Sequence, residues 1–143
     1  MLYNFYIIEE SFSNFQDKKD VCFYHSFYIY LKQYYPNIMS FEDFLNFKQK
    51  DSYFISIEQF TKEYKELYNY LIFKQPQLKN ILKKSALGIT KFIEEKNKVE
   101  LLGFIKLKDL IKNKIHITSK LETKEKPIIL LNHQEHFNPI MLK

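Results

Sequence analysis

Four of the five cysteine and histidine side chains of this 143-residue chain form two pairs along the sequence, and both residue types bind transition metals. Cys22 and His25 lie three residues apart in a stretch with helical periodicity, so both project from one face of the expected helix. His133 and His136 repeat this spacing near the other end. Because Zn²⁺ prefers thiolate and imidazole ligands, two pairs that meet in the fold would form a tetrahedral site. The alternative is that the cysteine packs as a small hydrophobe and the histidines are ordinary core or surface residues.

The second pair lies in an apolar run followed by Asn-His, PIILLNHQEHFNPIML over residues 127–142. This pattern resembles the first motif of glycerolipid acyltransferases, in which Asn-His is followed by four residues and then Asp. The resemblance implies that His133 is the general base that deprotonates an acyl-accepting hydroxyl. Asn138 stands where that family has Asp, and an amide cannot stabilise an imidazolium as a carboxylate does. The resemblance therefore implies a degenerate acyltransferase-like protein.

The composition excludes two kinds of phosphate chemistry. All 22 basic residues are lysine, so there is no arginine finger and no planar fork for a bidentate anion contact. Two glycines are too few for a P-loop or a G-x-G-x-x-G turn. The abundance of Lys, Phe, Tyr and Asn is typical of an AT-rich gene.

Charge is divided unevenly between the two halves of the chain. Residues 1–73 carry 7 Lys against 10 acidic residues, whereas residues 74–143 carry 15 Lys against 7. Helices followed by a lysine-tipped hairpin would suit a winged-helix protein that binds nucleic acid through phosphate contacts. The candidate basic patch consists of Lys79, Lys83, Lys91, Lys106, Lys108, Lys112 and Lys114. The alternative is that lysine is simply the solubilising residue that this codon usage favours.

The aromatic residues favour a protein-binding function over catalysis. Eleven tyrosines are more than a small core can supply with hydroxyl partners, so some must lie at the surface. Exposed tyrosine beside an acidic face is typical of protein interfaces. We therefore expect a non-enzymatic interaction protein of the immunity or inhibitor type, which neutralises a toxin or enzyme through Glu58, Glu63 and Glu66. Nucleic-acid binding and a zinc or acyltransferase-like site around His133 are the two alternatives.

The overall composition is that of one domain over residues 1–143, with an acidic helical half and a basic half. A single cysteine, no apolar run of roughly 20 residues and no leader-like start predict a cytoplasmic protein without a membrane span. No cofactor other than the possible zinc is expected.

The periodicity predicts an α+β fold that is predominantly helical, with about four helices followed by a C-terminal β-hairpin. A short N-terminal strand is available to pair with that hairpin. The expected elements are a strand over 2–8, helices over 20–35, 40–50, 56–71 and 76–97, and hairpin strands over 114–121 and 127–131. Ser40 and Ser56 are expected to cap their helices. Residues 99–112 fit a helix and a strand equally well, and the state of the C-terminal HQEHFNPIMLK is left open.

Overall fold

The computed structural model describes residues 1–143. Its helices are α1 (Cys22–Tyr34), α2 (Phe41–Leu45), α3 (Ile57–Lys74), α4 (Leu78–Lys83), the 3₁₀ turn η1 (Glu94–Lys96) and α5 (Leu107–Ile111). Its strands are β1 (Leu2–Tyr3), β2 (Phe5–Ile7), β3 (Asn14–Phe15), β4 (Lys18–Lys19), β5 (Ser85–Ile93), β6 (Lys98–Lys106), β7 (Ile117–Thr118), β8 (Lys126–His133) and β9 (His136–Leu142).

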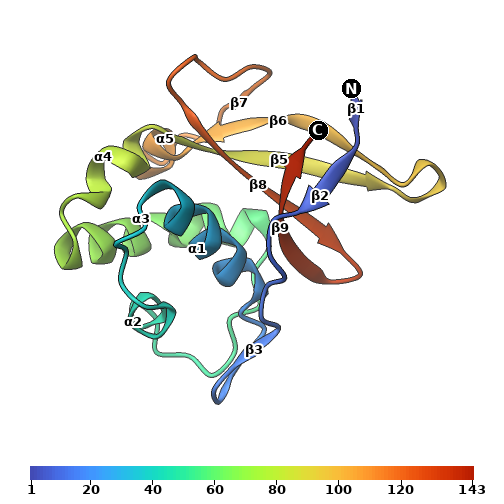
Figure 1. Cartoon of the computed structure of the whole chain (residues 1–143). Helices are drawn as coiled ribbons and strands as arrows, with labels where there is room; N and C mark the ends of the chain where they lie inside the picture. The colour runs from blue at the N-terminus through green and yellow to red at the C-terminus, as the bar shows by residue number, and fades with distance from the viewer.

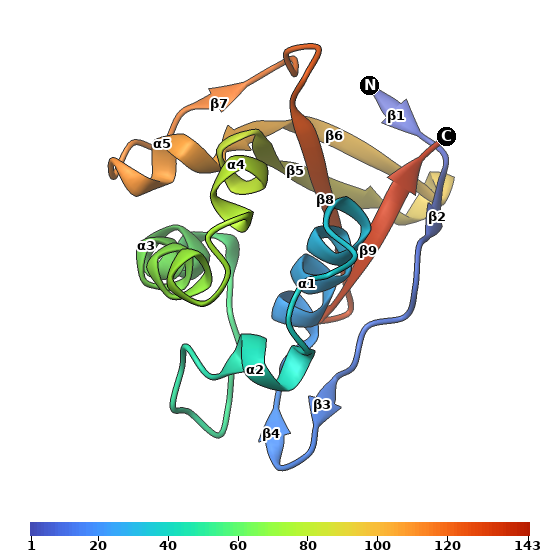
Figure 2. The same ribbon diagram turned by 60° about the vertical axis from the view of Figure 1, so that its left-hand side comes forward.

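Seven of the strands form one mixed sheet that nearly closes on itself. The order is β1-β6-β5-β8-β9-β2, with β7 also paired to β6. Only the β5–β8 pair is parallel. Strands β1 and β2 are separated by Asn4 alone, yet they pair with opposite edges of this path, β1 with β6 and β2 with β9. The first seven residues thus join the two edges, and both views place the chain ends side by side (Figures 1 and 2).

The expectation of a predominantly helical fold is wrong, because the chain is 35% helix and 31% strand. The main error lies in the segment 76–97, where α4 ends at Lys83 and β5 begins at Ser85. Apolar residues in Ser85–Ile93 match a helical period, but Gly88 and the β-branched residues that follow it favour a strand. Pairing with β6 on one side and β8 on the other decides the outcome.

The expected hairpin of 114–121 with 127–131 is also wrong. Strand β7 pairs with β6, whereas β8 pairs with β9 and with β5. The turn between β8 and β9 is formed by Gln134 and Glu135, which both have positive φ (53° and 64°). Asn-Gly and Asp-Gly are the usual signals of such a turn, so this Gln-Glu turn leaves no recognisable mark in the sequence. The ambiguous residues 99–112 contain both a strand, β6, and a helix, α5.

The three helices expected in the first half form, although α2 ends at Leu45 and not near residue 50, and residues 14–19 contain the short strands β3 and β4. Ser40 and Ser56 are N-caps whose hydroxyls accept from the amides of Asp43 and Gln59, as expected. Ten of the 13 residues of α1 are buried, because this helix lies between strands β8 and β9 and the helices α2 and α3 (Figure 2). Residues of both halves contribute to one hydrophobic cluster.

No helix of the structure combines the length and the apolar character needed to cross a bilayer.

Candidate functional site: a thiol cluster at the start of α1

Cys22 is the first residue of α1, and its sulfur contacts the edge of β9. The Sγ atom accepts a hydrogen bond from the Phe137 amide at 3.4 Å. Strand β2 pairs with β9 only from Ile140 onward, so the edge at Phe137 has no strand partner. Side chains take that place: Ser26 Oγ donates to the Phe137 carbonyl at 3.1 Å, and the Ser11 hydroxyl donates to the same oxygen. The start of α1 is thereby fixed against the C-terminal strand.

The surroundings of the Cys22 sulfur act on its proton in opposite directions. Burial raises the pKa of the thiol above its ordinary value, because only 8% of the residue is exposed. The amides of Phe137, Phe23 and Cys22 itself face the sulfur and act to lower the pKa. The resting group is therefore a protonated thiol whose neighbouring amides favour negative charge.

His136, the neighbour of Phe137, has both ring nitrogens in contact with serine hydroxyls. Ser11 Oγ lies 3.1 Å from Nε2, and Ser13 Oγ lies 3.3 Å from Nδ1. The Ser11 proton goes to the Phe137 carbonyl, so Ser11 Oγ can only accept from His136. With the Ser11 proton on the Phe137 carbonyl, the matching tautomer of His136 has its proton on Nε2 and its lone pair on Nδ1, which is the form that a general base would need.

Asn138 lies on the same face of β9 as His136, because side chains alternate along a strand. Its Oδ1 accepts from the Ser11 amide at 3.1 Å and lies 3.3 Å from the Ser11 hydroxyl. Asn138 thus orients Ser11, and Ser11 orients His136. We call Ser11, Ser13, Cys22, His136 and Asn138 the thiol cluster. The sulfur and the imidazole make no hydrogen bond to each other in this structure.

The segment that carries the two serines is fixed to α1. The Ser13 carbonyl accepts from the Val21 amide at 3.0 Å, directly before Cys22. The Phe12 amide donates to His25 Nδ1 at 2.8 Å. Residues 11–13 consequently bridge the first turn of α1 and the end of β9.

A groove opens beside Cys22. A small hollow at the sulfur is walled by Phe54, Ile55, Glu135 and Phe137. The same four residues also line an adjoining cavity of about 200 Å³, which continues over Gly88 of β5. Most of its lining is apolar, and Phe54 at its rim is 61% exposed. Cys22 lines only the small hollow, which has a volume of about 20 Å³, and the other four residues of the thiol cluster line neither cavity.

The structure brings together only half of the residues predicted to bind zinc. Cys22 and His136 share the network described above. His25 instead stacks on Phe12, with ring centroids 4.2 Å apart, and burial lowers the pKa of its imidazole to about 4. His133 lies 3.5 Å from a carboxylate oxygen of Glu94. No group of three or more His, Cys, Asp or Glu side chains is placed to hold a metal ion.

The acyltransferase resemblance pairs His133 with Asn138, and the structure does not. His133 packs on Phe92, with ring centroids 4.5 Å apart, while Asn138 contacts Ser11.

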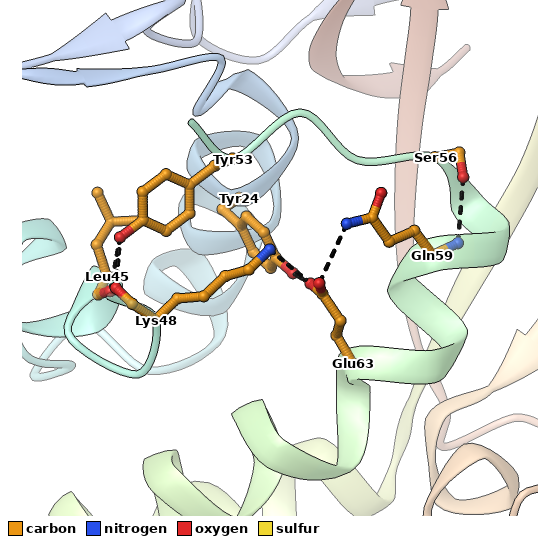
Figure 3. Close-up of polar contacts among 7 residues, drawn as sticks. All are labelled: Tyr24, Leu45, Lys48, Tyr53, Ser56, Gln59 and Glu63. Carbon is orange, nitrogen blue, oxygen red and sulfur yellow. Dashed lines mark hydrogen bonds and ion pairs between the residues drawn. The ribbon is translucent and has the colours of Figure 1, made fainter. Parts of the chain in front are cut away.

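The three acidic residues proposed for partner binding occupy different environments. Glu63 belongs to a charged cluster with Tyr24, Lys48 and Gln59 (Figure 3). Glu58 makes a 3.8 Å ion pair with Lys62 across one helical turn, and both side chains are exposed. Glu66 is exposed on the same helix. Glu63 is thus already engaged inside the fold, and partner binding by these residues stays a prediction.

The proposed basic patch is partly assembled. Lys83, Lys106 and Lys108 line one hollow, and Lys112 lines the next. Lys91 lies apart from these, on β5 opposite Glu100 of β6. Because the expected hairpin does not form, the chain has no winged-helix arrangement.

Sequence reasoning missed the roles of Ser11, Ser13 and Asn138. The sequence offers one signal for Asn138, its alternation with His136 in what proves to be strand β9, and none for Ser11 or Ser13. That signal does not show that residues more than 100 positions apart meet.

Comparison of this chain with protein-family models, with curated proteins and with solved structures gives no match.

Proposed function

We propose that this chain is a thiol-dependent acyl-transfer enzyme, a hydrolase of amide or ester bonds in which Cys22 is the nucleophile. The observation that carries the proposal is the hydrogen-bonded path from Asn138 through Ser11 to His136, which ends beside the amide that contacts the Cys22 sulfur. Cysteine, histidine and asparagine are a known set for this chemistry, with the amide orienting the imidazole. The proposal departs from the non-enzymatic function expected from the sequence.

The groups that carry protons at rest are consistent with Cys22 as the nucleophile and His136 as its base. Burial keeps the Cys22 thiol protonated at rest, so the nucleophile requires a base. In the tautomer that the mechanism needs, His136 Nδ1 carries the lone pair, and the one contact of this nitrogen is the exposed Ser13 hydroxyl at 3.3 Å. In the reaction, the sulfur would form a thioester with the acyl carbon while the thiol proton passes to Nδ1 and then to the leaving group. Water would next attack the thioester, with His136 again accepting the proton and returning it to the sulfur.

The backbone amides around the sulfur supply the electrostatic part of the mechanism. Helix α1 has no side-chain cap, so the amides of its first turn are not occupied by a capping oxygen. These amides and the Phe137 amide are placed to stabilise negative charge that develops on the sulfur or on a carbonyl oxygen beside it. The adjoining groove would hold the rest of the substrate.

The test uses the fact that Cys22 is the only cysteine, so every thiol adduct reports on it. Purified protein is treated with iodoacetamide and with p-nitrophenyl acetate, and the adducts are followed by intact mass. We expect acetylation of Cys22 with release of p-nitrophenol, and an alkylation rate that falls at least about tenfold in His136→Ala.

His133→Ala is the matched control, because His133 lies three residues away and outside the thiol cluster. It should leave both rates unchanged. Equal alkylation rates in wild type and His136→Ala, or p-nitrophenol release that survives in Cys22→Ala, would contradict the proposal.

The inhibitor function expected from the sequence stays a separate prediction. A pull-down from the native lysate at about 0.1 M salt, with and without nuclease, tests it. One protein retained in near-equal amount after nuclease treatment would support it.

A further inference from the structure

Lysine side chains converge on one end of the sheet, at the opposite end of β8 from the thiol cluster. Helix α4 ends there, α5 begins there, and the loop from β7 enters β8 there (Figure 2). A hollow of about 120 Å³ at this junction is lined by five lysines, two glutamates and Ser85, with no apolar residue. The lysines are Lys83, Lys84, Lys106, Lys108 and Lys124.

A second hollow extends the first. It has a volume of about 490 Å³, shares Lys83 and Lys108 with its neighbour, and adds Lys112. We call the six lysines of the two hollows the lysine basin. Against these six positive charges stand only Glu122 and Glu125, so the basin carries a net charge of +4.

Both glutamates contact the same lysine, and the second oxygen of Glu125, Oε2, is buried without a hydrogen-bond partner. Lys106 Nζ lies 2.9 Å from Glu122 Oε1 and 3.0 Å from Glu125 Oε1. These hydrogen bonds raise the pKa of Lys106 and lower that of Glu122. The other five lysines have no carboxylate within ion-pair distance, and all five are exposed.

The basin has a fixed frame. The Lys126 amide donates to the Lys84 carbonyl at 2.6 Å, and Glu125 and Glu122 are joined by a backbone hydrogen bond of 3.0 Å. Together with the ion pairs to Lys106, these bonds hold the loop that carries Lys124 against the end of α4. The backbone positions of the five unpaired lysines are therefore fixed near one another, and their positive charges repel. A bound anion would reduce this repulsion.

We propose that the lysine basin binds a compact, multiply phosphorylated anion. A concave hollow with lysines on several sides fits closely spaced phosphates better than an extended strand. The chain has no arginine for bidentate phosphate contacts, so lysine charges are its means of binding phosphate. Tyr68 is the one aromatic residue that lines the basin, and it is only 7% exposed, so the basin offers little aromatic surface for stacking bases.

The test measures binding of inorganic tripolyphosphate to the intact chain by calorimetry and by thermal shift. We expect a 1:1 complex that raises the Tm and weakens as salt increases from about 0.05 M to about 0.3 M. The triple variant Lys84→Gln, Lys108→Gln, Lys124→Gln should bind at least about tenfold more weakly. These three side chains are exposed and unpaired, so the variant is expected to fold.

The control triple Lys50→Gln, Lys65→Gln, Lys96→Gln changes the net charge equally at exposed sites outside the basin. It should retain wild-type affinity. Equal weakening by the two triples would show that net charge alone attracts the anion, which overturns the proposal. Tighter binding of a 20-nucleotide single-stranded DNA than of tripolyphosphate would also overturn it, in favour of a nucleic-acid surface. Thiol reactivity at Cys22 is unaffected by any of these variants if the two sites are independent.

Discussion

The charged cluster around Glu63 and the thiol cluster around Cys22 both lie against the first turns of α1, and they differ in how tightly their polar atoms are bonded. Glu63 Oε2 accepts from Tyr24 at 2.6 Å and from Lys48 at 2.8 Å, while Gln59 donates to Oε1 at 3.1 Å (Figure 3). In the thiol cluster, the contacts of Cys22 and His136 run from 3.1 to 3.4 Å.

The two clusters also differ in charge and in access. Lys48 is 7% exposed and sits over the rings of Tyr24 and Tyr53, so opposite charges are enclosed together. Burial acts to raise the pKa of the Glu63 carboxyl, but hydrogen bonds from Lys48, Tyr24 and Gln59 outweigh it and hold that pKa below its ordinary value. The thiol cluster instead borders a groove. The comparison teaches that the first cluster encloses a pair of opposite charges inside the fold, whereas the second places a protonated thiol beside a hollow.

The largest expected effect is on stability and comes from Glu63→Ala. The substitution leaves the enclosed ammonium of Lys48 and the Tyr24 hydroxyl without their partner, which should lower the free energy of unfolding by about 4 kcal/mol. Urea denaturation measures it. Glu58→Ala, five residues earlier on α3, removes only an exposed ion pair and should cost less than about 0.5 kcal/mol. Equal losses in the two variants would break the contrast between the clusters.

The next effect is a pH dependence that originates at His25. Its folded pKa of about 4 lies below the roughly 6.5 of an unfolded histidine, so the unfolded chain binds the extra proton first. The free energy of unfolding should therefore fall by about 3 kcal/mol as the pH drops from about 6.5 to about 4.

Urea midpoints across that range, compared between wild type and His25→Gln, isolate this contribution. Glu63 also loses stabilisation in acid, but its depressed pKa places that loss mainly below about 4.5. A wild-type curve that stays flat between pH 6.5 and 4.5 would contradict the assignment of a neutral, buried His25.

A smaller effect is expected for Asn138→Ala, on reactivity rather than on stability. Without the amide, Ser11 no longer holds His136 in its tautomer, so the alkylation and acetylation rates at Cys22 should fall about tenfold, or roughly 1.4 kcal/mol. Asn80→Ala, at an exposed position of α4, is the control. A large loss of stability with unchanged rates would assign Asn138 to the scaffold and not to the site.

The smallest effect concerns Ser56, which joins a helix cap to the charged cluster. Its hydroxyl accepts from the Gln59 amide at 3.1 Å, and the side chain of Gln59 donates to Glu63. Ser56→Ala should cost about 1 kcal/mol, and Ser56→Asp should restore the stability because aspartate also caps helices. Combining Ser56→Ala with Glu63→Ala in a double-mutant cycle would show whether the cap helps to position Gln59.

The first half of the fold could be predicted because its information is local. Ser40 and Ser56 mark the helix starts, and the spacing of apolar residues from Ile57 to Leu71 fits the helical period but not the alternation of a strand. The second half could not be predicted, because the apolar residues of Ser85–Ile93 fit both a helix and a strand. Pairing with β6 and β8 decides in favour of the strand. The thiol cluster was out of reach for a related reason: Cys22 and His136 were singled out, but for zinc, and Ser11 carries no motif at all.

The pairing of β1 with β6 and of β2 with β9 has a consequence for the order in which the fold forms during synthesis. Residues 2–7 are synthesised before their partners, which are Val99 and Glu100 of β6 and Ile140–Leu142 of β9. They cannot pair until β6 and β9 have been made, and contacts of such long sequence separation form late in folding. Phe137, which anchors the sulfur, lies in that same last strand. On the proposed mechanism, the Cys22 thiol would meet the imidazole of His136 only after β9 has been made and has joined the sheet.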